Sequence, residues 1–233
     1  MITLRSANDR GHANFGWLDS HHTFSFASYY DPRHMGVSAL RVINDDWVKP
    51  GMGFDTHPHR DMEIISCVLS GSIEHKDTMG FHTVLKAGDI QVMSAGTGIR
   101  HSEFNPSQTE DLNFLQIWIQ PNVGGVKPQY QEKNFSDSKG VTLVVSADGR
   151  HGSLPIHQEA NIYKLSLHQG TDSGQQTHFE TLPGRTYYLH IAQGQLVVND
   201  LEMSSGDGAM ITKETLLSFE TIDAVDALLF ELP

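Results

Sequence analysis

Apolar residues in this chain recur at every second position, and this alternation limits its fold more than any other feature. In segment 112–120, Leu115, Ile117 and Ile119 share one face of an extended chain, and Pro121 then ends the run. A period of two is typical of half-buried strands, whereas a helix needs apolar residues three and four apart. The same pattern predicts strands at 38–43, 64–69, 142–145, 163–167, 187–192 and 227–232.

Turn-forming residues separate the predicted strands. Gly71 and the pair Gly206-Asp207 lie between apolar runs, where such residues form tight turns. The sequence carries no long helical stripe, so only short helices are expected, around 8–14 and 148–153. Many short strands joined by such turns favour an all-β sandwich or barrel.

The chain divides into two predicted bodies. Its 233 residues are enough to bury a core without disulfides. Segment 122–138 is rich in Gly, Pro, Asn, Gln and Lys and interrupts the strand pattern, which is typical of a connection between domains. The expected architecture is two stacked small β-barrels of the jelly-roll type, an N-terminal one at 1–121 and a C-terminal one at 139–233.

A faint internal repeat agrees with two bodies. The run 69–73 leads to a Gly-Asp turn at Gly88, and the run 192–196 leads to a similar turn at Gly206. The interval between the glycines is five residues shorter in the second copy. The repeat is therefore suggestive of a duplicated β unit.

The charge balance excludes several partners. Sixteen Lys and Arg against 28 Asp and Glu give a formal net charge of −12, so the protein's field repels nucleic acids and anionic membranes. No apolar run approaches the roughly 20 residues needed to span a bilayer. The single cysteine, Cys67, cannot form an internal disulfide, and the first residues lack the order of a signal peptide. We therefore expect a cytoplasmic protein that contacts neither nucleic acid nor membrane directly.

Two pairs of donor residues predict a metal site. His57-Pro58-His59 and His101-Ser102-Glu103 each place two metal-binding side chains two residues apart. On an extended segment such residues point to the same face, and imidazole nitrogens bind metals at about 2.0–2.1 Å. Each pair can therefore converge on one ion, and Pro58 places the first pair near a sheet edge.

These residues also carry a resemblance to a known family. The first cupin motif is similar to Gly51, His57, His59, Glu63 and Gly71, with one extra residue before Gly71. The second is similar to Gly88, Gly96, His101 and Asn105, with a longer gap before His101 and Ser94 where proline is usual. The whole chain resembles the pirin family of bicupins, and within it the bacterial pirin-like quercetinases, through the stretches 10–13, 22–26, 57–60 and 96–103.

The resemblance implies a ligand set. Pirins hold one metal with three histidines and one glutamate, which correspond here to His57, His59, His101 and Glu103. Glu63 is the rival fourth ligand, because other cupins use that position, and it otherwise has a role in orienting a ligand or a water. The donor set suits Fe, Cu, Ni, Mn or Zn, and iron is favoured only through the family.

The resemblance also implies an activity. A pirin-type quercetin 2,3-dioxygenase would open a flavonol, a small hydroxylated aromatic compound, with O₂ and release carbon monoxide. Glu103 would be the catalytic base that takes the proton of the substrate's hydroxyl group. The alternative function is a non-catalytic module that senses metal or redox state and binds a regulatory protein, as some pirins do.

Other residues have less specific interpretations. Phe24, Phe26 and Arg60 are candidates for the lining of a substrate pocket, although aromatic residues at such spacing are often core residues. Cys67 is expected to be a small core residue rather than a nucleophile. The C-terminal barrel is expected to be metal-free, because its histidines are isolated in the sequence: His151, His157, His168, His178 and His190.

Overall fold

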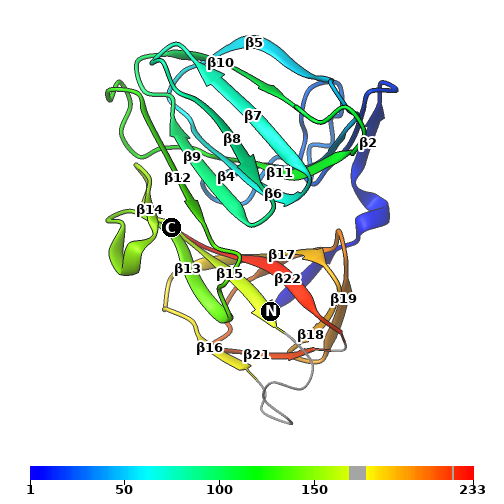
Figure 1. Cartoon of the computed structure of the whole chain (residues 1–233). Coiled ribbons are helices and arrows are strands. Elements are labelled where there is room, and N and C mark those ends of the chain that lie inside the picture. Colours follow the sequence, from blue (N-terminus) through cyan, green and yellow to red (C-terminus); the bar gives the residue numbers. More distant parts are fainter. Residues whose placement is uncertain (168–176, 222) are drawn as a thin grey trace.

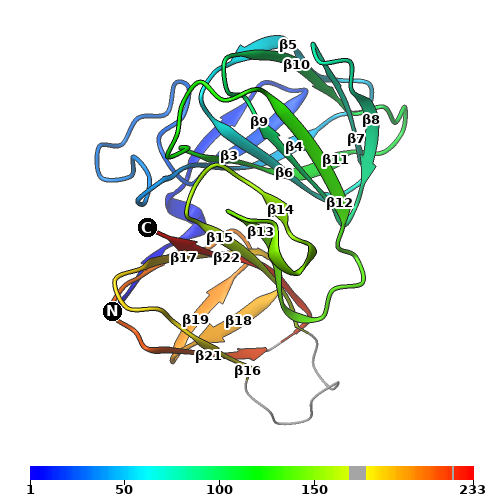
Figure 2. The same cartoon turned by 90° about the vertical axis from the view of Figure 1, so that its left-hand side faces the viewer.

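The chain folds into two β-sandwiches that lie one above the other (Figures 1 and 2). This architecture is a computed structural model that describes residues 1–167, 177–221 and 223–233. Each sandwich pairs a seven-stranded sheet with a four-stranded sheet. The two larger sheets lie in the middle of the stack, and the smaller sheets lie at its two ends (Figure 1).

The N-terminal sandwich holds most of the first half of the chain. In spatial order, its larger sheet consists of β12 (Gln129–Asn134), β9 (Asp89–Ser94), β6 (Glu63–Ser70), β11 (Leu112–Ile119), β4 (Leu40–Val48), β3 (Leu18–His22) and β2 (Gly11–Asn14). Its smaller sheet consists of β5 (Gly53–His59), β10 (Ile99–Phe104), β7 (Ser72–Asp77) and β8 (His82–Lys86). Neighbouring strands in both sheets are antiparallel.

The C-terminal sandwich has the same plan. Its larger sheet consists of β1 (Ile2–Arg5), β20 (Gly208–Ile211), β17 (Thr186–Gln193), β22 (Val225–Leu232), β15 (Asn161–Leu167), β13 (Gly140–Ser146) and β14 (Leu154–Pro155). Its smaller sheet consists of β16 (Thr177–Glu180), β21 (Leu216–Thr221), β18 (Gln195–Val198) and β19 (Leu201–Ser204). The short pair of β13 and β14 is parallel.

A shared hydrophobic core joins the two sandwiches. Leu115, Ile117 and Ile119 of β11 point toward the C-terminal domain and pack with Phe230 and Leu232 of β22. The alternation in the sequence predicted this shared face, but not the second sheet that covers it. The even-numbered residues of β11 point into the N-terminal sandwich, where Phe114 belongs to a separate core.

The predicted internal repeat is visible in the turns. Gly71 joins β6 to β7 with φ of 74°, and Gly194 joins β17 to β18 with φ of 89°. A side chain at either position would also meet backbone, because a Cβ atom would lie 2.6 Å from the carbonyl oxygen of Asp111 or 2.1 Å from that of Ala224. Both turns therefore require glycine for conformation and for space.

Several strands differ from the sequence-based expectations. The strand β1 pairs with β20 in the C-terminal sheet, although it precedes the whole N-terminal domain. The strand β12 lies inside the expected connection 122–138 and pairs with β9. Its sequence is almost wholly polar, so the alternation that marks the other strands is missing. Long-range pairing of this kind leaves no periodic signal in the sequence.

The expected all-β fold of two stacked small barrels of the jelly-roll type is confirmed, and each barrel is open. Among the described strands, no backbone ladder joins the larger sheet of either domain to the smaller one. Each domain is therefore an open sandwich with the cupin arrangement of strands. The two expected short helices are single 3₁₀ turns, η1 (Ala7–Asp9) and η2 (Arg150–Gly152), and 11–14 forms β2 instead. Within the described ranges, no helix is long and apolar enough to cross a membrane.

The shared core gives a stability prediction. We expect Ile117→Ala to lower the free energy of unfolding by about 2–5 kcal/mol, because it leaves a cavity where Ile117 is fully buried. Leu182→Ala is the control, since Leu182 is 56% exposed. Urea denaturation of both full-length variants measures the difference. Equal losses in the two variants would contradict a role for Ile117 in holding the domains together.

Candidate metal centre

Three histidines converge inside the N-terminal sandwich. Antiparallel pairing of β5 with β10 places His57 directly opposite His101 and His59 opposite Ile99. The ring centroids of His57, His59 and His101 lie 4.5–4.8 Å apart, so their ligating nitrogens can surround one point. His101 is buried, whereas His57 and His59 are partly exposed. The cluster is therefore reached from solvent on the side of β5.

The histidines have nitrogen atoms available for a metal. The carbonyl oxygen of Asp55 lies 2.7 Å from Nδ1 of His57, so Nδ1 carries the hydrogen and Nε2 has a lone pair. Both ring nitrogens of His101 are buried, and neither has a hydrogen-bond partner in the described part of the chain. Burial, and then the neighbouring imidazoles, lower the pKa of His59 to about 4 and that of His101 to about 3. These two rings are therefore neutral at neutral pH, which is the form that binds metals.

Glu103 lies beside this cluster and is held in place by other side chains. Its Oε1 accepts hydrogen bonds from Ser66 Oγ at 3.1 Å and Gln91 Nε2 at 2.9 Å. Nε2 of Gln91 also donates to Ser66 Oγ at 2.9 Å, which orients that amide. Oε2 of Glu103 is buried and has no partner among the described residues. It is therefore free to bind an ion or accept a proton.

Glu63 faces the other domain instead. Ser94 Oγ donates to its Oε2 at 2.7 Å, and Nδ1 of His157 lies 3.3 Å from its Oε1. Glu63 shares a face of β6 with Ile65 and Cys67, which belong to the shared core, whereas Ser66 points into the sandwich. Burial raises the pKa of Glu63. Its carboxylate thus bridges the two domains on the side of the sheet away from the three histidines.

His75 is a buried member of the site that the sequence interpretation missed. Its ring centroid is 5.3 Å from that of His101, and its donor atom lies within 4.8 Å of donor atoms of His101 and Glu103. Oδ2 of Asp77 lies 3.1 Å from Nε2 of His75, which leaves Nδ1 with a lone pair. A carboxylate that orients an imidazole in this way is common around metal centres. The only sequence signal was the spacing of His75 and Asp77 in one strand.

Polar residues cover the inner face of the larger sheet beside the cluster. Ser20 donates a hydrogen bond to Asp46. Nδ1 of His22 lies 2.8 Å from Oδ1 of Asn44. All four residues are buried. Burial raises the pKa of Asp46 to about 7, with the hydrogen bond from Ser20 acting against it and the negative charges of Asp45 and Glu103 acting with it. The interior of this sandwich is therefore polar around the site rather than apolar.

Aromatic side chains flank the histidines. The ring centroid of Trp118 lies 5.1 Å from that of His59, and the ring centroid of Phe26 lies 5.4 Å from that of Trp118. On the other side, Tyr130 stacks on His75 at 4.6 Å. These rings form apolar surfaces on which a planar ligand could pack.

Phe24 and Arg60 are placed differently from Phe26. Phe24 is buried in the shared core, where its ring is 5.3 Å from that of Tyr188. It therefore lies between the domains and not with the histidines, because the chain after β3 turns its side chain toward the C-terminal sheet. Arg60 is exposed, and it donates to the carbonyl oxygen of Thr97 at 2.9 Å. It lies one residue beyond His59, at the rim.

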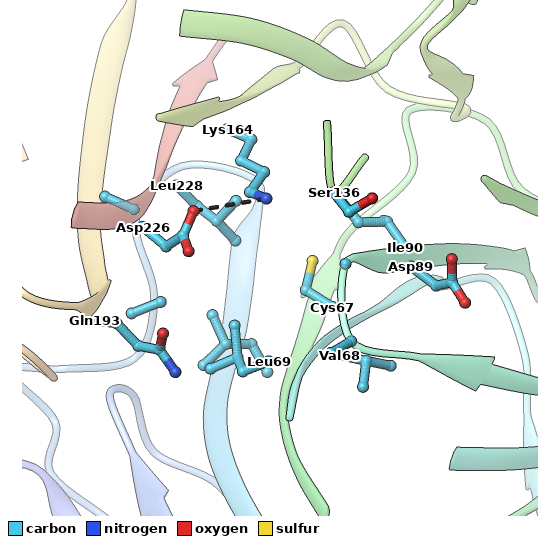
Figure 3. Close-up of a pocket in the computed structure, with 15 residues that line it drawn as sticks. Cys67, Val68, Leu69, Asp89, Ile90, Ser136, Lys164, Gln193, Asp226 and Leu228 are labelled. Atoms are coloured by element: carbon cyan, nitrogen blue, oxygen red, sulfur yellow. Dashed lines mark ion pairs between the residues drawn. The ribbon is translucent and has the colours of Figure 1, made fainter. Parts of the chain in front are cut away.

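A separate cavity lies between the two domains. Its volume is about 260 Å³, and Figure 3 shows Cys67 and Leu69 on one side and Lys164 and Asp226 on the other. Nζ of Lys164 is 3.6 Å from Asp226. Burial raises the pKa of Cys67 to about 12, so its thiol is a core group and not a nucleophile, as predicted.

The C-terminal histidines do not join the cluster in the described structure. His157 contacts Glu63 across the domain boundary, and His190 is fully buried in β17. His168 lies outside the described residues.

The donor set fits a transition-metal ion. Three imidazoles and one carboxylate form a borderline nitrogen and oxygen set. Both nitrogens of His101 and Oε2 of Glu103 are buried without partners in the described residues, which is costly in the absence of an ion. Two cupin domains in one chain, with this cluster in the first, define a bicupin with one candidate metal centre.

Comparison with known proteins assigns the family. The Pirin family profile matches residues 3–119, and the profile of the quercetinase C-terminal cupin domain matches residues 143–232. The chain belongs to the pirin family.

Relatives resemble the chain over its full length. Quercetin 2,3-dioxygenase of Escherichia coli K12 is 49% identical over 233 residues, which are 100% of this chain and 99% of that protein. A pirin-like protein of Caulobacter vibrioides is 39% identical over 235 residues, covering 99% of each chain. The crystal structure of the bacterial pirin YhhW from Escherichia coli in complex with nickel(II) has a TM-score of 0.94 at 48% identity, and the match covers 100% of this chain and 99% of that chain.

The raised pKa of Asp46 predicts a pH-dependent stability difference. Between the pKa of an unfolded aspartate, about 3.9, and the folded value of about 7, the unfolded chain loses this proton while the folded chain keeps it. The stability that Asp46 contributes is therefore present at low pH and lost as the pH rises to 7. Asp46→Asn has no such titration, so we expect its stability relative to the natural chain to increase by about 2 kcal/mol between pH 5 and 8.

Urea denaturation of both proteins across this pH range, without added metal, measures the difference. Asp137→Asn, at an exposed position, is the control substitution. A difference between Asp46→Asn and the natural chain that stays constant with pH would contradict the assignment.

Proposed function

We propose that this protein is a metal-dependent dioxygenase that opens hydroxylated aromatic compounds of the flavonol class with O₂. The observation that carries the proposal is the convergence of His57, His59 and His101 in a partly accessible polar interior, with Glu103 close to His101. The quercetin 2,3-dioxygenase of Escherichia coli, which is 49% identical, supports the reaction class.

The proposed ligands are His57, His59, His101 and Oε2 of Glu103. The two nitrogens of His101 and Oε2 of Glu103 are buried without partners in the described part of the chain, as unoccupied ligand atoms would be. Glu63 is the poorer candidate, because Ser94 and His157 already engage both of its oxygens on the opposite face. When bound, a redox-active divalent ion would lower the pKa of a substrate hydroxyl and assist its reaction with O₂.

The identity of the metal is a separate question. The family resemblance favours iron, and the related YhhW structure contains nickel(II). The donor set itself accepts Fe, Cu, Ni, Mn or Zn.

Glu103 is proposed to accept the proton of the substrate's hydroxyl group. Ser66 and Gln91 hold Oε1, so the carboxylate keeps its position when Oε2 changes partner. This arrangement reconciles the roles of ligand and base, because Oε2 can bind the ion in the resting protein and take the proton when substrate arrives.

The aromatic side chains support a planar substrate. Trp118 and Phe26 lie beside His59, which is the partly exposed side of the cluster. A flavonol ring that packs on these surfaces would bring its hydroxyl group toward the histidines. Arg60 at the rim would assist the approach of an anionic phenolate.

Substitution of the two glutamates tests the ligand assignment. We expect Glu103→Gln to weaken metal binding at least tenfold, because a neutral amide replaces the carboxylate ligand. Glu63→Gln should retain metal and affect mainly the contact between the domains. Elemental analysis after equilibrium dialysis measures metal content in both variants. Loss of metal from Glu63→Gln alone would reverse the assignment.

Oxygen uptake tests the activity. After reconstitution with Fe, Cu, Ni and Mn in turn, we expect at least one form to consume O₂ steadily in the presence of quercetin and to release carbon monoxide. Glu103→Gln should lose at least 100-fold in kcat, within the range for a lost base. Full activity in that variant would refute the role of Glu103 as base.

Bound metal without any oxygen uptake would favour the alternative function. In that case the acidic protein would be a module whose affinity for a basic regulatory protein depends on the redox state of the metal. Measurement of partner affinity with oxidised and reduced metal would then replace the turnover assay.

A further inference from the structure

A second cluster of donor side chains lies on the hairpin of β2 and β3. Their antiparallel register places His12 opposite His21 and Asn14 opposite Asp19. Neighbouring residues in a strand point to opposite faces, so Ser20 and His22 point into the sandwich while these four side chains lie on the other face. His12, Asp19 and His21 are at least one-third exposed, which makes the cluster accessible to ions in solution.

One carboxylate oxygen lies close to both imidazoles. Oδ1 of Asp19 is 2.7 Å from Nε2 of His12 and 3.8 Å from Nδ1 of His21. The two rings are stacked, with centroids 4.5 Å apart and an interplanar angle of 14°. The side chain of Asn14 donates to the other oxygen, Oδ2, at 2.9 Å and so fixes the direction of Oδ1. One donor atom from each of His12, Asp19 and His21 therefore lies within 4.8 Å of the other two.

The spacing of these atoms suits a small divalent ion. Ligand bonds of about 2.0–2.2 Å place the donor atoms of a tetrahedral ion about 3.3 Å apart. The observed separations of 2.7 Å and 3.8 Å lie on either side of this value. Small rotations of the exposed imidazoles are enough to equalise them, and the ion would replace the hydrogen shared by His12 and Asp19.

The local charges permit a cation. Arg10 is the nearby positive charge that would oppose binding. Its guanidinium pairs with Asp45 at 3.5 Å, which offsets that charge beside the cluster.

We propose that His12, Asp19 and His21 form a second metal site, separate from the centre inside the sandwich, which binds a borderline divalent ion such as Zn²⁺. Two imidazoles and one carboxylate are ligands of this class. Water completes the coordination on the exposed side. The ion would link the edge strand β2 to β3 and stabilise the hairpin whose inner face carries Ser20 and His22.

Zinc stoichiometry tests this proposal. Full-length protein freed of metal is equilibrated with Zn²⁺ by dialysis, and the ions bound per chain are counted by elemental analysis. We expect two ions for the natural chain and one ion fewer for His12→Ala/His21→Ala. Asp19→Asn, which preserves the shape of the side chain, should also lose one ion.

A matched histidine provides the control. His82 is also exposed and lies 2.8 Å from Oε1 of Glu74, but Lys76 engages the other oxygen. Within the described residues, His82 does not lie in a cluster of three metal-binding side chains. His82→Ala should therefore retain the full number of ions. The same number of ions in His12→Ala/His21→Ala as in the natural chain, or an equal loss in His82→Ala, would overturn the proposal.

A further variant separates this site from the proposed dioxygenase centre. His57→Ala/His59→Ala should lose the interior ion and keep the ion of the hairpin. If the natural chain binds only one ion, and only His12→Ala/His21→Ala loses it, the hairpin site is supported and the interior site is refuted. The reverse pattern would refute the hairpin site and leave the proposed function intact.

Discussion

The antiparallel register of β5 and β10 is the constraint on which the proposed metal centre depends. It places His57 opposite His101, and the alternation of side chains then brings His59 and Glu103 to the same interior. A shift of the register by one residue would turn one pair of donors away from the other. The register between β5 and β10 shifts between His101 and Glu103. On its other side, β10 pairs with β7, and there Glu103 lies opposite His75.

The larger N-terminal sheet serves two purposes because its strands have two faces. On β6, Ile65 and Cys67 point toward the C-terminal domain, whereas Ser66 points inward and donates to Glu103. On β9, Ile90 and Val92 join the shared core while Gln91 holds the same carboxylate. The C-terminal domain thus supports the site indirectly. Its larger sheet packs against the outer face of β6 and β9, the strands whose inner face carries Ser66 and Gln91.

The polar interior of the N-terminal sandwich lowers the stability of this domain. His101 and Glu103 are buried with unpartnered atoms in the described chain, and Asp46 is buried beside them. Such groups destabilise a core unless an ion or a substrate engages them. Metal binding at this centre should therefore be coupled to folding stability. The hairpin cluster of His12, Asp19 and His21 is different, because its exposed side chains are already solvated.

Local sequence patterns were enough to predict the strands, the paired β units and the three histidine donors, because a period of two and a spacing of two residues are local properties. The sequence did not reveal His75, Gln91 or the cross-strand pair of His12 and His21, because these meet only through register between strands. It also left Glu63 and Glu103 as rivals, since both lie in strands of suitable pattern. The tertiary structure places them on opposite sides of the larger sheet, because a second sheet covers the face that carries Glu63, whereas Glu103 lies in the interior.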